Sequence, residues 1–364
     1  YRLGKIYSDP SLSLAFLEEL IYLSAERIYL IFAHSVKAEF YAIKREDASK
    51  GCLGAVSVLG SFYLLYELAV AKVARLALDI LEEIDDRPYV GAAKALVSEL
   101  TGPTGMKMVG PYDYEAPAYW YSKEAPGGSF GFNTETGIGA NIPQTESLAK
   151  MIPADQLWPV SEAWNKHCTT SSTAMNSMDV LTATMNSTYG EAVDFNDYVR
   201  KGHALDYDAT RAMFEAFRVN IPVSTGIIQW MLNSAWPSLY WQMYDWYLVP
   251  TAGYYSVKKA CEPQQLVYNY VDKHIYAVND EAECFDLTAH AELYNLAGEL
   301  TTKAQCDAHM HAGTSTKLFE IPQCEEVSFM FLTLKDSKGN EVATNTYCLS
   351  PVDDIHDWDN YNWI

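Results

Sequence analysis

Short apolar segments alternate with helical segments along most of this chain, and the alternation stops at Glu262. Helical spacing of apolar residues marks three segments, at 11–48, 64–85 and 196–217. Short strands are indicated at four places, namely from Tyr89, at 105–110, at 129–135 and at 225–232. Strands that alternate with helices favour a parallel α/β arrangement.

From Glu262 onward the pattern is that of strands alone. Runs such as "LVYNYVDKHIYAVND" and "SFMFLTLKDSKGNEVATNTYCLS" alternate apolar with polar residues and are joined by polar turns. The stretch "DSKGN" inside the second run is a hairpin turn signal. We therefore expect an α/β part followed by a β-sandwich.

The formal net charge of −21 argues against nucleic acid or an anionic membrane as a partner, because both need clusters of Lys and Arg. A neutral or cationic ligand is compatible with it, and so is an acidic surface that serves solubility alone. The uncharged run 52–66 ends at Glu67, short of the ~20 apolar residues that cross a bilayer. We interpret that run as a buried strand leading into a helix.

Glu135 closes the strand-like run "GGSFGFNTETG" at 127–137. A carboxylate at the C-terminal end of a parallel strand is typical of catalysis in barrel enzymes, whereas a solvated loop glutamate is the alternative. Asn133 lies two residues earlier, and residues two apart in a strand point to the same side. Asn133 is therefore expected to line the same pocket.

The segment 230–247 holds four of the nine tryptophans at spacings that fit neither one helix face nor one strand face. Aromatic platforms beside polar side chains suit a sugar ring, and core packing is the alternative. The candidates for substrate contact here are Asn233, Trp236 and Trp241. In the similar segment 110–121 the candidates are Asp113, Tyr114, Tyr119 and Trp120.

Other catalytic signatures are missing from the sequence. There is no Ser-His-Asp order, Walker loop, dinucleotide-binding glycine fingerprint or HExxH helix, and the histidines lack metal-like partners, so we expect no cofactor and no metal. Four cysteines lie in the last quarter of the chain, at 284, 306, 324 and 348. In a secreted protein, one or two disulfides would staple that region.

Several long motifs carry a family resemblance over about residues 101–364. They are "TGPTGMKMVGPYDYEAPAYWY", "GGSFGFNTETG", "IPQTESLAKMIP", "NDYVRK" and "STGIIQWMLNSAWPSLYWQMYDWYLVPTAGYYSVKKACEP". In this order they resemble the exo-β-D-glucosaminidase branch of glycoside hydrolase family 2.

The resemblance implies a secreted, extracellular enzyme that releases glucosamine from the non-reducing ends of chitosan oligosaccharides with retention of configuration. It implies a (β/α)₈ catalytic barrel followed by an immunoglobulin-like β-sandwich. On that basis 56–260 is expected to be a partial barrel, 261–364 the sandwich, and 1–55 an atypical helical segment. The glutamate of the family's "FN[ST]ET" motif is its nucleophile, and here that residue is Glu135.

The resemblance places the general acid on an aspartate of a "GSD" motif, and this chain departs from that pattern. Gly60-Ser61 is followed by Phe62, and the nearest carboxylate is Glu67, a weak candidate inside an apparent helix. A retaining mechanism needs two carboxyl groups roughly 5–5.5 Å apart. A fragment, an altered N-terminus, a catalytically silent carbohydrate-binding or structural protein, and a related specificity such as β-mannosidase all stay open.

Overall fold

The structure is a computed structural model, and it describes residues 97–98, 102–103, 105–108, 110–170, 174–352 and 356. Apart from Ser98 and Gly102, these residues belong to one compact unit of the chain. The expected helices at 11–48 and 64–85, the strand from Tyr89, the run 52–66 and the acid candidate Glu67 lie outside the described residues.

A three-stranded parallel sheet forms the first part of the described chain. Its strands are β3 (Met106–Lys107), β4 (Gly131–Thr136) and β5 (Ser224–Gln229), with β4 in the middle. The predicted strands at 129–135 and 225–232 are confirmed to within a few residues, and the one at 105–110 is shorter than predicted. Two further short strands precede the sheet, β1 (Val97–Ser98) and β2 (Gly102–Pro103).

The connection between β4 and β5 is largely helical, as predicted. The helices of the described part are α4 (Pro117–Tyr121), α5 (Thr145–Met151), η1 (Ala154–Gln156), α6 (Glu162–Asn165), α7 (Asp179–Tyr189), α8 (Phe195–Val219) and α9 (Ala252–Ala260). Helix α8 confirms the prediction at 196–217. It begins where the Asp194 side chain accepts the backbone N–H of Asp197, an N-cap that satisfies one of the donors left open at a helix start. In the described residues no helix is both long and apolar enough to cross a membrane.

Two antiparallel sheets follow α9 and pack face to face, which confirms a β-sandwich. One has the strand order β10-β7-β6 and the other β12-β11-β8-β9. The strands are β6 (Gln264–Tyr268), β7 (His274–Asn279), β8 (Phe285–Asn295), β9 (Leu300–Met310), β10 (Thr314–Glu320), β11 (Ser328–Lys335) and β12 (Glu341–Leu349). The "DSKGN" turn joins β11 to β12, where Gly339 takes a φ of +82°.

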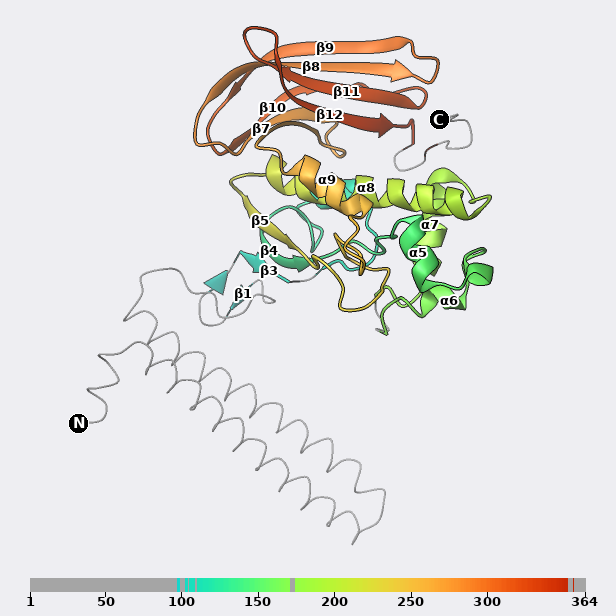
Figure 1. Cartoon of the computed structure of the whole chain (residues 1–364). Coiled ribbons are helices and arrows are strands. Elements are labelled where there is room, and N and C mark those ends of the chain that lie inside the picture. The colour runs from blue at the N-terminus through green and yellow to red at the C-terminus, as the bar shows by residue number, and fades with distance from the viewer. Residues whose placement is uncertain are drawn as a thin grey trace, which may run out of the picture. The chain divides into compact units, whose positions relative to one another are not determined.

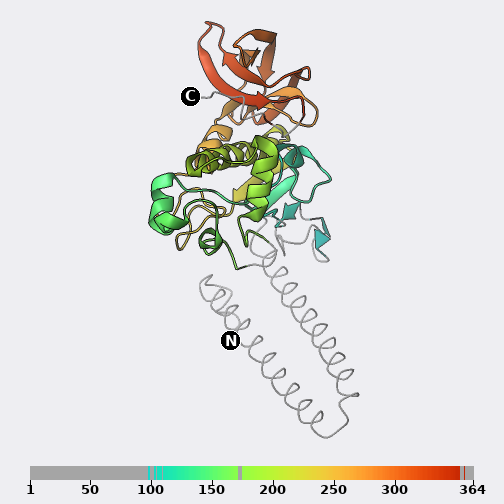
Figure 2. The same ribbon diagram turned by 90° about the vertical axis from the view of Figure 1, so that its right-hand side faces the viewer.

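Helix α8 lies between the parallel sheet and the sandwich (Figures 1 and 2). Its buried Ala209, Met213 and Ala216 belong to the same apolar cluster as Val267 and Val278 of the sandwich. The helix therefore buries apolar surface against both parts, which is the main source of their association.

A buried polar network joins α8 to strand β12. The carboxylate of Glu215 accepts hydrogen bonds from the Asn345 amide at 2.8 Å and from the Tyr347 hydroxyl at 2.9 Å. Arg211, one helical turn earlier, donates to the backbone oxygen of Thr346 and lies 3.9 Å from Glu215. Burial raises the pKa of Glu215, and the Arg211 charge opposes that shift.

Candidate active site

Glu135 lies at the C-terminal end of β4, the central strand of the parallel sheet, with only Thr136 after it in the strand. Its neighbours are hydrogen-bonded to the end of β3 and to the segment that follows it. Thr134 donates its hydroxyl to the backbone oxygen of Lys107, and Thr136 donates to that of Pro111, each at 3.1 Å. These bonds hold the end of β4 in place and leave Glu135 half-buried at the strand's edge.

The close approach of β3 and β4 depends on glycine at position 131. Gly131 has a φ of +58°, and a Cβ there would lie 2.0 Å from the backbone oxygen of Gly105. Any side chain would therefore push the two strands apart and strain the backbone. This glycine allows the close pairing in which Lys107, at the end of β3, lies opposite Asn133.

Tyr112 is a candidate site residue that the sequence did not single out. Its hydroxyl donates a 2.8 Å hydrogen bond to Oε1 of Glu135. Burial and the adjacent carboxylate raise the pKa of Tyr112, so the phenol stays protonated and stays a donor. The usable signal was position: Tyr112 follows β3, and parallel neighbours end at the same edge of a sheet.

Trp241 connects the tryptophan-rich segment to this site. Its indole N–H donates to the backbone oxygen of Tyr112 at 2.6 Å, and the two rings lie 5.5 Å apart. Gln229, at the end of β5, donates to the backbone oxygen of Trp241 at 2.8 Å. The predicted residue Trp241 therefore lies next to the residue that holds Glu135, although its role in substrate contact stays a prediction.

Asn133 supports the site from within the fold. Its side chain is fully buried, its amide donates to the backbone oxygen of Gly110, and its Oδ1 accepts the backbone N–H of Glu135 at 3.3 Å. The sequence predicts that Asn133 lines the same pocket as Glu135. In the structure its side chain is fully buried, and it holds the backbone of Glu135 in place.

The structure does not support the prediction that Trp120 contacts substrate. It is 0 % exposed and belongs to the apolar cluster between α4 and α8, so it is not open to a ligand. An aromatic-rich sequence segment contains core residues as well as open ones, and only packing separates them.

The other candidates of segment 110–121 face different neighbours. The Asp113 carboxylate accepts the backbone N–H of Met175 at 2.9 Å, and the Tyr119 hydroxyl accepts that of Gly127 at 3.1 Å. Burial, with the nearby Asp113 charge, raises the pKa of Glu115. Asn233, from the later segment, is exposed and bonds locally to the backbone of Ser234.

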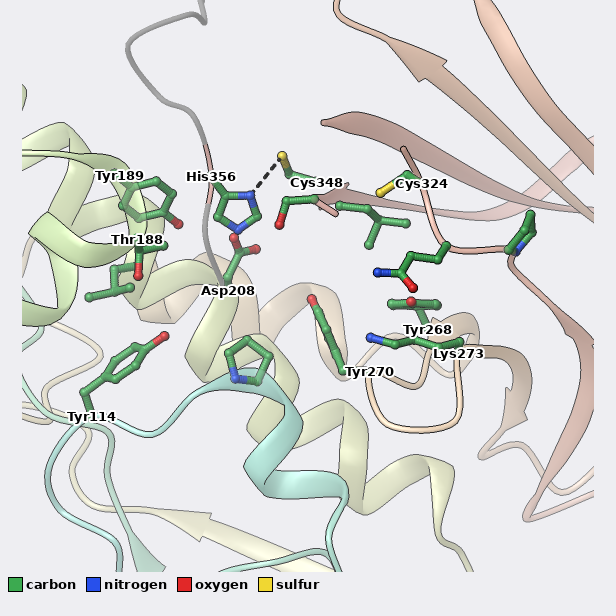
Figure 3. A pocket seen from close by; sticks show the side chains of 16 residues that line it. Tyr114, Thr188, Tyr189, Asp208, Tyr268, Tyr270, Lys273, Cys324, Cys348 and His356 are labelled. Carbon is green, nitrogen blue, oxygen red and sulfur yellow. Dashed lines mark hydrogen bonds between the residues drawn. The ribbon is translucent and has the colours of Figure 1, made fainter. Parts of the chain in front are cut away.

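Tyr114 lines a separate hollow, which lies between the helices and the sandwich (Figure 3). This hollow encloses about 670 Å³, part of it open to solvent. Asp208, Tyr270 and Cys348 also line it, and Nδ1 of His356 lies 3.5 Å from the Cys348 sulfur. Glu135 is not among its lining residues, so the hollow is not the site of the strand-end carboxylate.

The described cysteines and histidines form neither disulfide bonds nor metal sites. None of the six described cysteines is in a disulfide. The disulfides predicted among the cysteines at 284, 306, 324 and 348 are therefore absent from this structure. No group of three metal-ligating side chains lies together in the described part of the chain.

The fold and the position of Glu135 indicate a class of enzyme without reference to any relative. A carboxylate at the C-terminal end of a parallel strand, with a supporting donor after the neighbouring strand, is the arrangement of active sites in parallel (β/α) barrel enzymes.

Comparison with known proteins narrows that class. No protein-family model matches the chain. The chain is 36% identical over 291 residues to an exo-β-D-glucosaminidase of Amycolatopsis orientalis, covering 76% of this chain and 28% of the relative. It is 32% identical over 287 residues to an exo-β-D-glucosaminidase of Hypocrea jecorina, covering 75% and 32%. The chain thus spans roughly a third of the length of these relatives.

Solved structures agree on the fold. The crystal structure of the Amycolatopsis orientalis exo-chitosanase matches with a TM-score of 0.69 and 34% identity, covering 77% of this chain and 35% of that one. A variant of the same enzyme has been solved in complex with PNP-β-D-glucosamine. A β-D-mannosidase of Dictyoglomus thermophilum matches with a TM-score of 0.62 at 19% identity, over 79% and 36%, which shows a shared fold alone.

Proposed function

We propose that this chain carries the nucleophile side of the active site of a retaining exo-β-D-glucosaminidase, a glycoside hydrolase that acts on chitosan oligosaccharides. The observation that carries the proposal is the hydrogen bond from Tyr112 to Glu135 at the C-terminal end of β4. The similarity to exo-β-D-glucosaminidases over three-quarters of the chain supports the choice of an amino sugar as substrate.

The role proposed for Glu135 follows from its geometry. Tyr112 holds Oε1, which leaves Oε2 to attack the anomeric carbon of the terminal sugar. The bond from that carbon to the leaving oxygen breaks, and the leaving oxygen takes a proton from a second carboxyl group. Water, deprotonated by the same group, then attacks the glycosyl-enzyme and releases glucosamine.

The proton donor is not assigned to a described residue. Glu67 remains the weak candidate that the sequence offers, and it lies outside the described residues. Secretion to the extracellular space also remains a proposal, tested by comparing the amount of protein in the culture medium and in the cells.

The deciding test measures hydrolysis of p-nitrophenyl-β-D-glucosaminide and of chitobiose by this chain and by its Glu135→Gln variant. We expect hydrolysis by the first and a loss of at least about a thousandfold in the second, because the covalent intermediate cannot form. Azide added to Glu135→Gly should restore release of nitrophenol and give a glycosyl azide of inverted configuration. Equal rates for the chain and Glu135→Gln would remove Glu135 from the mechanism.

Two alternatives have distinct outcomes in the same assay. Catalytic silence, as expected of a carbohydrate-binding or structural protein, would appear as sugar binding without hydrolysis by either variant. A β-mannosidase would hydrolyse p-nitrophenyl-β-D-mannoside faster than the glucosaminide.

A further inference from the structure

Trp236 is a large apolar side chain that is open to solvent and yet held in one orientation. It is 38% exposed. Its indole N–H donates to the Tyr240 hydroxyl at 3.0 Å, and the His167 ring stacks on it at 5.7 Å with an interplanar angle of 20°. Because His167 covers one face of the indole, the exposed part lies away from His167.

The backbone around Trp236 is fixed to His167 as well. The His167 Nδ1–H donates to the backbone oxygen of Pro237 at 2.8 Å, and the backbone N–H of Leu239 donates to the oxygen of His167 at 3.1 Å. These contacts join segments about 70 residues apart in the chain. An exposed aromatic ring that is already immobile loses little conformational entropy when a ligand stacks on it.

A continuous series of contacts leads from this ring to Glu135. Tyr240 packs against Trp241 with ring centroids 4.9 Å apart. The Trp241 indole donates to the backbone of Tyr112, and the Tyr112 hydroxyl donates to Glu135. Trp236 is therefore linked to the strand-end carboxylate through three aromatic residues, Tyr240, Trp241 and Tyr112.

We propose that Trp236, backed by His167, is a platform for the sugar on the leaving-group side of the cleaved bond. The apolar C–H face of a pyranose stacks on an aromatic ring, and a protonated amine over a Trp face adds a cation–π attraction. This inference rests on the proposed function: an exo-enzyme places one terminal sugar on the nucleophile's side, so a further sugar contact must lie on the leaving-group side. The ligand is thus an amino-sugar oligosaccharide of two or more units.

The catalytic test compares Trp236→Ala with Trp246→Ala, a tryptophan of the same segment that is 46% exposed. For each variant, kcat/KM is measured for chitotetraose and for p-nitrophenyl-β-D-glucosaminide, which carries a single sugar. We expect Trp236→Ala to lower the ratio of the two values about fivefold or more, and Trp236→Phe to restore part of it. An unchanged ratio for Trp236→Ala, or the same fall for Trp246→Ala, would overturn the proposal.

A binding test separates this inference from the catalytic proposal. Titration calorimetry with chitotetraose is carried out on Glu135→Gln, with and without Trp236→Ala. A weakening of the Kd by about fivefold or more supports the platform even if the chain hydrolyses nothing. Equal chitotetraose affinities with and without Trp236→Ala would overturn the platform. So would the absence of measurable binding by Glu135→Gln alone. The role of Glu135 is decided separately, by the hydrolysis assays.

Discussion

The hydroxyl of Tyr112 and Oε1 of Glu135 lie 2.8 Å apart, although 23 residues separate them in the chain. They meet because β3 and β4 are parallel neighbours, so the end of β4 and the segment that follows β3 lie at one edge of the sheet. The bond fixes which carboxylate oxygen is free to react. A strand-end carboxylate thereby becomes an oriented group rather than a solvated one.

Replacing Tyr112 by Phe should lower the rate of glycoside hydrolysis and leave the fold intact. A hydrogen bond to a charged group contributes about 1.5–3 kcal/mol, so we expect kcat/KM to fall by about 10- to 100-fold. The assay is hydrolysis of p-nitrophenyl-β-D-glucosaminide, with circular dichroism to check the fold. Tyr255→Phe is the matched control, since Tyr255 is 51% exposed on α9 and should have no effect. Wild-type activity in Tyr112→Phe would show that the bond does not orient the carboxylate for reaction.

Removing the Glu215 carboxylate should destabilise the whole described unit. Glu215→Ala removes one of the two carboxylates that pair with the buried Arg211, and it removes an acceptor that both Asn345 and Tyr347 use. Breaking a buried ion pair from one side costs about 3–5 kcal/mol in free energy of unfolding. Urea unfolding followed by tryptophan fluorescence and by circular dichroism measures the change.

The control for that prediction is Glu262→Ala. Glu262 pairs with Lys259 at 2.7 Å, but its side chain is 40% exposed, so the pair contributes less than about 1 kcal/mol. We expect the two spectroscopic probes to report one transition, because α8 and β12 share the network. Equal losses of unfolding free energy in the two variants would show that the buried Glu215 network stabilises the fold no more than the exposed pair does.

Lys107 should make stability depend on pH. Its side chain is fully buried at the end of β3, where the ammonium group lies 3.6 Å from the centre of the Phe130 ring and donates to the backbone oxygen of Gly128. Burial lowers the pKa of Lys107 to about 8. In the unfolded chain a lysine has a pKa of roughly 10.4.

The sign of the effect follows from proton counting. Between about pH 8 and about pH 10.4 the unfolded chain holds a proton on this lysine that the folded chain has lost, so the free energy of unfolding rises with pH. The stability of wild type relative to Lys107→Met should therefore rise by about 2 kcal/mol between about pH 7.5 and about pH 9.5, as measured by urea unfolding. A difference that stays flat or falls would show that the folded-state pKa is not lowered.

Much of the described fold was predictable from local pattern. The period of apolar residues predicted α8 within one or two residues at each end, and the alternation after Glu262 predicted antiparallel strands. The "DSKGN" turn was predictable because a hairpin turn depends on a few consecutive residues. The short length of β3 was not predictable from the sequence. The extent of strand pairing depends on the neighbouring strands more than on local propensity.

The site was only partly predictable. Position at a strand end singled out Glu135, but nothing local to Tyr112 distinguished it from the other tyrosines of segment 110–121. The tryptophans also differ in exposure in a way that the sequence does not reveal. Trp120 is fully buried and Trp236 is 38% exposed, although both lie in aromatic-rich segments.

The sequence by itself determined where helix α8 and most strands of the described part lie, and which carboxylate ends a central strand. Periodicity and turn chemistry are carried by residues two to four apart, so both can be read along the chain. Only the tertiary structure decided that Tyr112 holds Glu135, that Asn133 is buried, and that Trp236 stands open on His167. Those relationships depend on distant segments that fold against one another, and burial and hydrogen bonding arise only when those segments meet.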